Sequence, residues 1–207
     1  MGAAGKEEPP HSTQRRACHK LVATSSQSGQ IRSLMDQRLG EFDREIGAAR
    51  GSEAAWAALC RYASAIAGHR LFTVMTVDLD AGLARRAYSD HPAEYPVTGT
   101  KLIQRDAWFD IVRGQRRSFV ANTISGIAKV FPDFELIRSL GCGSVVNLPV
   151  VLGDELAAII NLLNAEHFYT PERVAALESQ LALPAKLCCA LAARFDARGH
   201  SQPAAMG

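Results

Sequence analysis

The pattern of apolar and polar residues is most informative over residues 144–163, where two apolar runs flank a polar turn. The runs read SVVNLPVV and LAAIINLL, and Gly153 and Asp154 lie in the turn between them. Apolar, β-branched runs around a short Gly-Asp turn are typical of a β-hairpin. Each run holds one amide, Asn147 in the first and Asn161 in the second. We therefore expect part of this buried hairpin to meet polar groups.

The residues before this hairpin predict two helices and a second hairpin. Loose apolar stripes predict one helix over residues 31–49 and another over residues 53–67, which Ser52 would cap. Residues 71–78 and 83–89 then predict two strands joined by a turn. Two helices followed by a hairpin exclude a simple alternation of strands and helices in a parallel sheet.

A long segment over residues 89–107 contains two prolines and predicts a loop. Loops of this length inside a compact domain are usually binding loops or lids. After it we expect a short helix at 108–113, a strand at 118–122 and another short helix at 134–140. These small elements lead into the hairpin at 144–163.

The last predicted helix starts with Thr170 as a cap and Pro171 in its first turn. Its apolar positions are spaced alternately by three and four: Val174, Leu177, Leu181, Pro184, Cys188, Leu191 and Phe195. Such a seam has two interpretations: the helix packs on its own sheet, or it joins a helical bundle shared by two subunits. We expect a homodimer in which this helix and the helix at 53–67 form a four-helix bundle.

Composition and charge narrow the class of protein. The 207 residues carry a net charge of +2, so no overall field would attract nucleic acid or an anionic membrane. The five cysteines form no CxxC pair, which argues against a disulfide framework or a zinc site and favours a reducing compartment. We therefore expect a cytoplasmic domain over residues 31–197, between a disordered arm (1–30) and a disordered tail (198–207).

Three stretches of the chain carry a resemblance to a known family. They are LFTVMTVDLDAGLARRAYS (71–89), SVVNLPVVLGDELAAIINLLNAE (144–166) and HFYTPERVAALESQLALPAKLCCALAA (167–193). With its elements in this order, the chain resembles a GAF domain, the small-molecule-binding module of many signalling proteins. One departure is that Ala157 and Ala158 stand where the family usually has a glycine at the start of the second closing strand.

The resemblance implies an α+β fold with a central antiparallel sheet of five or six strands. We expect the order opening pair, middle strand, closing pair. Helices from both termini would cover one face, and the short helices with the lid loop would cover the other. The implied function is that of a sensor that holds a small molecule and acts through a protein partner, with an unspecified ligand and cofactor. The alternative is a small enzyme on the same scaffold.

The expected pocket lies beneath the loop at 89–107, where GAF ligands bind. Aromatic side chains with one nearby cation suit a small planar or carboxylate-bearing molecule, unless the aromatic rings themselves fill the space. The candidate ligand-binding residues are Tyr88, Tyr95, Lys101, Trp108, Asn122, Cys142, Asn147 and Asn161.

The strand register decides where the two amides point. With a two- or four-residue turn, Asn147 lies opposite Ile160 and the amides face opposite sides of the sheet, whereas one β-bulge puts both on one face. We expect one amide to be structural and Asn161 to face the ligand. The reason is the resemblance: in enzymatic members of the family, the corresponding position is similar to a carboxylate that contacts substrate.

Cys142 is the candidate nucleophile, because it lies between two glycines that allow close approach. Free methionine-R-sulfoxide reductase, a GAF enzyme, uses several cysteines near its pocket and paired carboxylates on its last strand. Here Cys142 is alone in that region, and Asn161 and Asn164 stand on that strand. The histidine that phytochrome-type GAF domains carry beside their cysteine is also missing. We therefore predict no catalytic residue.

The histidines give no metal signature in the sequence. His69, His91 and His167 are far apart along the chain and lie on loops or at the ends of elements. No glycine-rich phosphate loop and no pattern of a DNA-reading helix occur. We therefore predict no metal site and no nucleic-acid partner.

Overall fold

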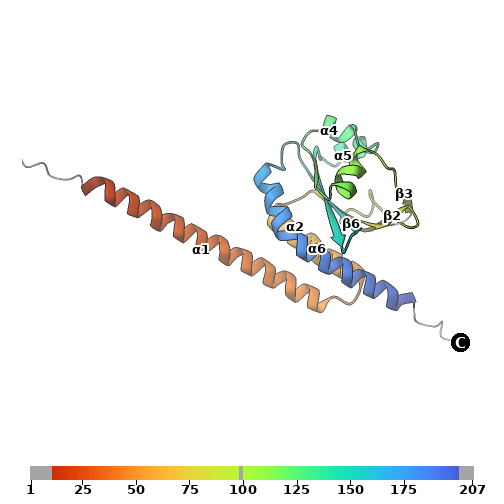
Figure 1. The fold of residues 1–207 in the computed structure, drawn as a ribbon, viewed down its shortest axis with the longest axis horizontal. Coiled ribbons are helices and arrows are strands. Elements are labelled where there is room, and N and C mark those ends of the chain that lie inside the picture. The colour runs from red at the N-terminus through yellow and green to blue at the C-terminus, as the bar shows by residue number, and fades with distance from the viewer. Residues whose placement is uncertain (1–10, 98–99, 201–207) are drawn as a thin grey trace, which may run out of the picture. The chain divides into compact units, whose positions relative to one another are not determined.

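The computed structural model describes residues 11–97 and 100–200, with side chains over 29–97 and 100–198 (Figure 1). The chain divides into two compact units, one ending at Glu41 and the other beginning at Phe42. The first helix, α1 (His11–Ala48), contributes to both units.

Helix α1 begins about one-third of the way along a segment that was expected to be a disordered arm. The prediction of disorder over 1–30 therefore differs from the structure over residues 11–30, which are helical. Two prolines directly precede His11, and no proline follows until Pro92, so no ring interrupts the helical hydrogen bonds. Of the predicted tail, residues 198–200 continue the last helix. Residues 1–10 and 201–207 lie outside the described residues.

The sheet has six antiparallel strands in the order β3-β2-β1-β6-β5-β4, which confirms the predicted α+β class. The strands are β1 (Leu71–Asp78), β2 (Leu83–Ser89), β3 (Thr100–Leu102), β4 (Phe119–Ala121), β5 (Ser144–Leu152) and β6 (Glu155–Asn164). The predicted strand order was wrong for the middle strand. Strand β4 was expected between the two hairpins. Instead β1 of the first hairpin pairs directly with β6 of the second, and β4 pairs with β5 at the edge of the sheet.

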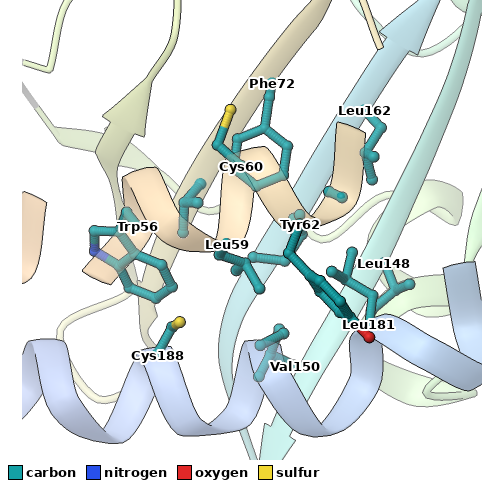
Figure 2. Close-up of a cluster of buried hydrophobic side chains, with 14 of the residues drawn as sticks. Trp56, Leu59, Cys60, Tyr62, Phe72, Leu148, Val150, Leu162, Leu181 and Cys188 are labelled. Atoms are coloured by element: carbon teal, nitrogen blue, oxygen red, sulfur yellow. The ribbon is translucent and has the colours of Figure 1, made fainter. Parts of the chain in front are cut away.

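Helices α2 (Ser52–Ile66) and α6 (Pro171–His200) cover one face of the sheet (Figure 1). Strand residues of alternating position, such as Phe72 and Leu162, meet Trp56, Leu59 and the buried side of α6 in one apolar core (Figure 2). The C-terminal part of α1 joins them, since the rings of Phe42 and Tyr62 lie 5.1 Å apart. The expected cap was wrong: Gly51 precedes α2 without a side-chain hydrogen bond to it, and Ser52 is its first residue.

The apolar seam of α6 is largely internal to the domain. Leu177, Leu181 and Cys188 are fully buried against the sheet and α2, and the Cys188 thiol donates to the carbonyl of Ala55. By length and hydropathy α6 would also suit a membrane span, but its buried side chains pack as those of a core helix do. The seam therefore follows the first of its two interpretations, the helix packed on its own sheet.

Short helices cover the other face of the sheet, as the resemblance implied. They are α3 (Ala107–Phe109), the π-helical turn η1 (Asp110–Gly114), α4 (Ile124–Ala128) and α5 (Phe134–Ser139). Helix α4 was not predicted; Thr123 caps it by accepting a hydrogen bond from the backbone of Gly126. Buried side chains from these elements form two smaller apolar clusters against the sheet, around Ile137 and around Val112.

Candidate functional site

A cavity of about 640 Å³ lies on the sheet face opposite α2 and α6. Strands β1, β2, β5 and β6 form its floor, and the segments 100–109 and 130–137 form its walls. Small-molecule sites usually measure about 300–1,000 Å³, so this volume suits a metabolite rather than a single water or ion.

A row of polar side chains crosses the floor of this cavity. Trp108 Nε1 donates to Asn147 Oδ1 at 3.0 Å, and Asn147 Nδ2 donates to Asn161 Oδ1 at 2.7 Å. Asn161 Nδ2 then donates to Thr73 Oγ1 at 3.0 Å. Each amide keeps a second N–H beyond the row, and the Thr73 hydroxyl keeps its own hydrogen. The row therefore offers the cavity hydrogen-bond donors from side chains that are themselves held in place.

A β-bulge aligns the two amides of this row. The Gly153-Asp154 turn sets Leu152 opposite Glu155, a register that would place Asn147 opposite Ile160. The register shifts after Val150, where Ala157 of β6 is left over, and from there Asn147 pairs with Asn161. Both amides consequently face the cavity, and the expected contact of Asn161 with a ligand stays a prediction.

One end of the cavity holds a cation, Arg86, with the Asp133 carboxylate near it. The Arg86 guanidinium lies 4.8 Å from the centre of the Tyr95 ring, and one of its Nη atoms donates to the carbonyl of Pro96. Its Nε is buried and has no hydrogen-bond partner among the described residues. Burial lowers the pKa of Arg86, although an arginine remains protonated in proteins. This Nε–H is a charged donor that the domain itself does not satisfy.

Tyr95 fixes the same end of the cavity from the lid loop. Its side chain is buried, and its hydroxyl donates to Asp133 Oδ2 at 2.9 Å, which ties the loop to the start of α5. Burial and the adjacent Asp133 carboxylate raise the pKa of Tyr95, so the phenol stays neutral. The ring can then serve as a face for Arg86 and as part of the cavity wall.

No family model matches the chain, and no curated protein matches it. Its solved structural neighbours include the GAF domain of a phosphoenolpyruvate-protein phosphotransferase from Coxiella burnetii, with 17% identity and a TM-score of 0.60 over 80% of this chain and 96% of that chain. The corresponding domain from Acinetobacter has 11% identity and a TM-score of 0.59, over 80% and 97% of the two chains. The GAF domain of a two-component sensor histidine kinase from Bacillus halodurans has 9% identity and a TM-score of 0.52, over 72% and 96%.

The chain has the GAF-domain fold. At these identities the likeness is one of fold, and it confirms what the resemblance implied from three stretches of sequence. Within this fold, the cavity occupies the space between the sheet and the lid loop, which is where the sequence predicted a pocket.

Five of the eight predicted site residues line the cavity. They are Tyr95, Lys101, Trp108, Asn147 and Asn161. The other three, Tyr88, Asn122 and Cys142, lie elsewhere, so the prediction that all of them would share one site was wrong in these positions.

Tyr88 lies on the helical face of the sheet because of a second bulge. Strict alternation along β2 would place Ala84, Arg86 and Tyr88 on one face. The register with β1 shifts between Val74 and Met75, which turns Tyr88 towards the core beside Phe72. Arg86 lies on the other side of the bulge and keeps its place in the cavity. The bulge therefore removes Tyr88 from the cavity and leaves Arg86 there.

Asn122 supports the loop that leads into α6. Its side-chain Nδ2 donates to the backbone carbonyl of Tyr169 at 2.9 Å. Its backbone carbonyl oxygen accepts a hydrogen bond from the backbone N–H of His167. The amide therefore ends strand β4 and holds a connection 45 residues later in the chain. It is a structural amide, the role that we had expected for one of the two amides in the hairpin.

Cys142 is a packed thiol rather than a nucleophile of the cavity. It is 3% exposed and lies in the apolar cluster around Ile137. Burial raises its pKa to about 11, so the thiol stays protonated at neutral pH. This arrangement gives no support to thiol chemistry at the cavity.

We expect none of the four described cysteines, Cys60, Cys142, Cys188 and Cys189, to be alkylated in the native protein at pH 8. Burial raises the pKa of Cys142 to about 11 and that of the other three to about 12, so the reactive thiolate is scarce. Mass spectrometry of a Cys18→Ser variant should count no alkylated cysteine in the native state and four after denaturation. Fast alkylation of native Cys142 would contradict its burial.

Three polar residues of the site, Thr73, Arg86 and Asp133, were not among the eight predicted ligand-binding residues. Every second residue of β1 faces the cavity, and Thr73 is the one polar residue in this otherwise apolar set. Arg86 is a charged residue within a predicted strand. Each therefore departs from its surroundings in the sequence. Asp133 gave none, because it reaches Tyr95 across 38 residues of chain through the fold alone.

Proposed function

We propose that this chain is a sensory GAF domain that binds a small molecule in the cavity above the sheet and passes the bound state to a protein partner. The observation that carries the proposal is the polar row on the cavity floor, which holds one buried and one half-buried amide with N–H groups left over for a ligand. Solved neighbours with this fold come from a sensor histidine kinase and a methyl-accepting chemotaxis protein, which supports a sensory role.

The proposed ligand is a small planar molecule that carries a carboxylate. Trp108 and Phe131, whose rings lie 5.9 Å apart, give the cavity an aromatic wall that suits a flat molecule. The unpaired Nε–H of Arg86 suits an anionic group at the other end. The donors of the polar row would meet acceptors on the edge of the ring system.

A thermal-shift screen of planar carboxylic acids and their neutral amide analogues tests this function. A ligand at a hundred times its Kd should stabilise the fold by about 2.7 kcal/mol, which corresponds to a rise in Tm of roughly 5–10 °C for a domain of this size. The acids should raise the Tm more than the amides. A flat response to the whole panel would contradict the proposal.

A matched pair of arginine variants locates the binding. Arg86→Met should lose the preference for acids over amides, because it removes the charged donor in the cavity. Arg85→Met should keep it, because Arg85 is exposed on the other side of β2 and does not line the cavity. An equal loss in both variants would show that the acids bind at another site.

The homodimer remains part of the proposal, through exposed helical faces rather than through the internal seam of α6. Leu183 and Leu187 are 76% and 42% exposed and lie one turn apart on α6. Within α1, the exposed apolar residues are Ile31, Leu34, Met35 and Leu39. A second copy of the chain would cover such stripes in the way that helical bundles do.

The four cysteines that the structure describes are all free thiols, which supports the expected cytoplasmic location.

We expect the double variant Leu183→Glu, Leu187→Glu to be a monomer where the wild type is a dimer. Two carboxylates at the centre of an apolar interface would be buried without partners, which disfavours association strongly. Light scattering coupled to size exclusion measures the mass of each form. Lys186→Glu, on the same helix, should leave the dimer intact, and a monomeric wild type would refute this interface.

A further inference from the structure

Three metal-ligating side chains meet at one edge of the helical core, away from the cavity. Cys60 lies on α2 and is labelled in Figure 2. His69 lies in the loop after α2, and Asp90 directly follows β2. Their ligand atoms all lie within 4.8 Å of one another. Cys60 is 8% exposed, and the side chains of His69 and Asp90 are 7% and 20% exposed. The fold thus brings together residues that are 9 and 21 positions apart in the sequence.

Two of the three separations match those of ligands around one tetrahedral metal ion. Zinc binds sulfur at about 2.3 Å and histidine nitrogen or carboxylate oxygen at about 2.0–2.2 Å, so two tetrahedral ligand atoms lie about 3.4–3.6 Å apart. Here His69 Nε2 lies 3.5 Å from Cys60 Sγ and 3.3 Å from Asp90 Oδ2. The third pair, Cys60 and Asp90, has ligand atoms within 4.8 Å of each other, so an ion shared by all three residues would draw this pair together to about 3.6 Å.

The geometry is not that of a catalytic Cys-His-Asp triad. In a triad the imidazole uses one nitrogen for the nucleophile and the other for the carboxylate. In this cluster Cys60 and Asp90 both approach Nε2, and Nδ1 of His69 has no partner among the described residues. Convergence of both groups on one nitrogen favours a shared ion over proton transfer along a chain.

Neighbouring groups orient the carboxylate for such an ion. Oδ1 of Asp90 accepts from the backbone N–H of Phe72 at 2.8 Å and lies 2.9 Å from Nδ1 of His91. These contacts occupy Oδ1 and direct Oδ2 towards His69. On the opposite side the Tyr88 hydroxyl forms a hydrogen bond with Cys60. Metal ligands are commonly held by outer contacts of this kind.

We propose that Cys60, His69 and Asp90 form a binding site for one divalent transition-metal ion, zinc, with water as the fourth ligand. The mixed sulfur, nitrogen and oxygen set suits zinc and cobalt better than magnesium or calcium, which prefer oxygen alone. Binding releases one proton per ion, from the Cys60 thiol to solvent. The neutral imidazole keeps one proton, which moves from Nε2, where it is donated to Asp90, to Nδ1, and Asp90 is already ionised. The sulfur becomes the metal-bound thiolate.

The charges of the three ligands differ between the metal-free state and the proposed metal-bound state. Burial and then the Asp90 carboxylate raise the pKa of Cys60 to about 12, so the metal-free thiol is neutral. For Asp90, burial raises the pKa, but hydrogen bonds from His69, Phe72 and His91 outweigh it and the net pKa is lowered. A cation between these groups would stabilise both the thiolate and the carboxylate.

Cobalt titration of the metal-free full-length chain, without an affinity tag, tests the site. Tetrahedral cobalt bound to a thiolate gives visible d–d bands and a near-ultraviolet sulfur-to-cobalt charge-transfer band, and equimolar zinc should abolish both. We expect one ion per chain in the wild type. Cys60→Ser should lose the charge-transfer band, and His69→Gln and Asp90→Asn should weaken cobalt binding by roughly tenfold or more. Circular dichroism confirms that each variant is folded.

Control variants separate this site from other thiols of the chain. Cys18→Ser removes a cysteine that is next to His19 in the sequence, and Cys188→Ser removes a buried cysteine outside the cluster. Both should bind cobalt as the wild type does. Absence of the charge-transfer band in the wild type, or its loss in Cys18→Ser with retention in Cys60→Ser, would overturn the proposal.

If Cys60→Ser fails to fold, the wild type and Asp90→Asn still decide the question. Zinc should raise the Tm of the wild type, a chelator should reverse the rise, and Asp90→Asn should respond less. No zinc-dependent shift in the wild type would refute the site. The cluster lies in the helical core and not in the cavity. Metal titration therefore tests only this site, and the screen of carboxylic acids tests only the sensory function.

Discussion

Replacing Trp56 by alanine is expected to lower the free energy of unfolding by about 3–5 kcal/mol, the usual cost of removing a large aromatic side chain from a core. Trp56 is 1% exposed and lies in the core between α2, α6 and the sheet (Figure 2). The neighbouring elements are regular helices and strands that cannot collapse into the space, so a cavity should remain. Urea unfolding followed by far-ultraviolet circular dichroism measures the loss.

The matched control for Trp56→Ala is Leu183→Ala. Leu183 is 76% exposed on α6, so its truncation should change the free energy of unfolding by no more than about 0.5 kcal/mol. An equally large loss at Leu183 would mean that this face of α6 is covered in solution, as in the proposed dimer. A loss below about 1 kcal/mol at Trp56 would contradict its position in the core.

The polar row should show coupling between its two amides. Asn147→Leu removes a partner of Trp108 and of Asn161, and Asn161→Leu removes a partner of Asn147 and of Thr73. Each single variant is expected to lose about 1–3 kcal/mol of folding free energy, because it leaves buried polar groups without hydrogen bonds. The double variant should cost about 1 kcal/mol less than the sum, since neither amide is then left facing a missing partner.

A double-mutant cycle by urea unfolding measures this coupling. Asn122→Leu serves as the comparison, because Asn122 bonds to the backbone of Tyr169 and not to the row. It should be destabilising alone and additive with Asn161→Leu. Additivity of Asn147→Leu with Asn161→Leu would mean that the two amides do not share a hydrogen bond.

The elements of this fold were predictable where each carried its own signal. The opening strands, the closing hairpin and the two helices that pack on the sheet have apolar residues at the period of their structure, and residues 71–78 were predicted with the observed limits. The order of the strands was not predictable in this way. The place of β4 at the edge depends on pairing between β1 and β6, which are about 80 residues apart and leave no local trace.

The residues of the site were predictable in part, and the two β-bulges explain which positions were predicted correctly and which were not. Asn147 and Asn161 were recognised as amides in apolar strands, but their common face required the extra residue at Ala157. Tyr88 had the same spacing from Arg86 as a cavity residue would have, and the bulge in β2 reversed its direction. A bulge costs little and has a weak sequence signature, yet it changes the face of every residue beyond it.

The pairing of β1 with β6 also sets a condition on how the chain folds during its synthesis. The strand at residues 71–78 leaves the ribosome early, but its central neighbour, residues 155–164, is among the later parts to be made. Until then the apolar side chains of β1, Phe72 and Val74 among them, have no complete sheet or C-terminal helix to cover them. We expect nascent chains stalled before residue 164 to stay bound to chaperones, and folding to occur in one late step because the pairing that joins the two hairpins, β1 with β6, is distant in sequence.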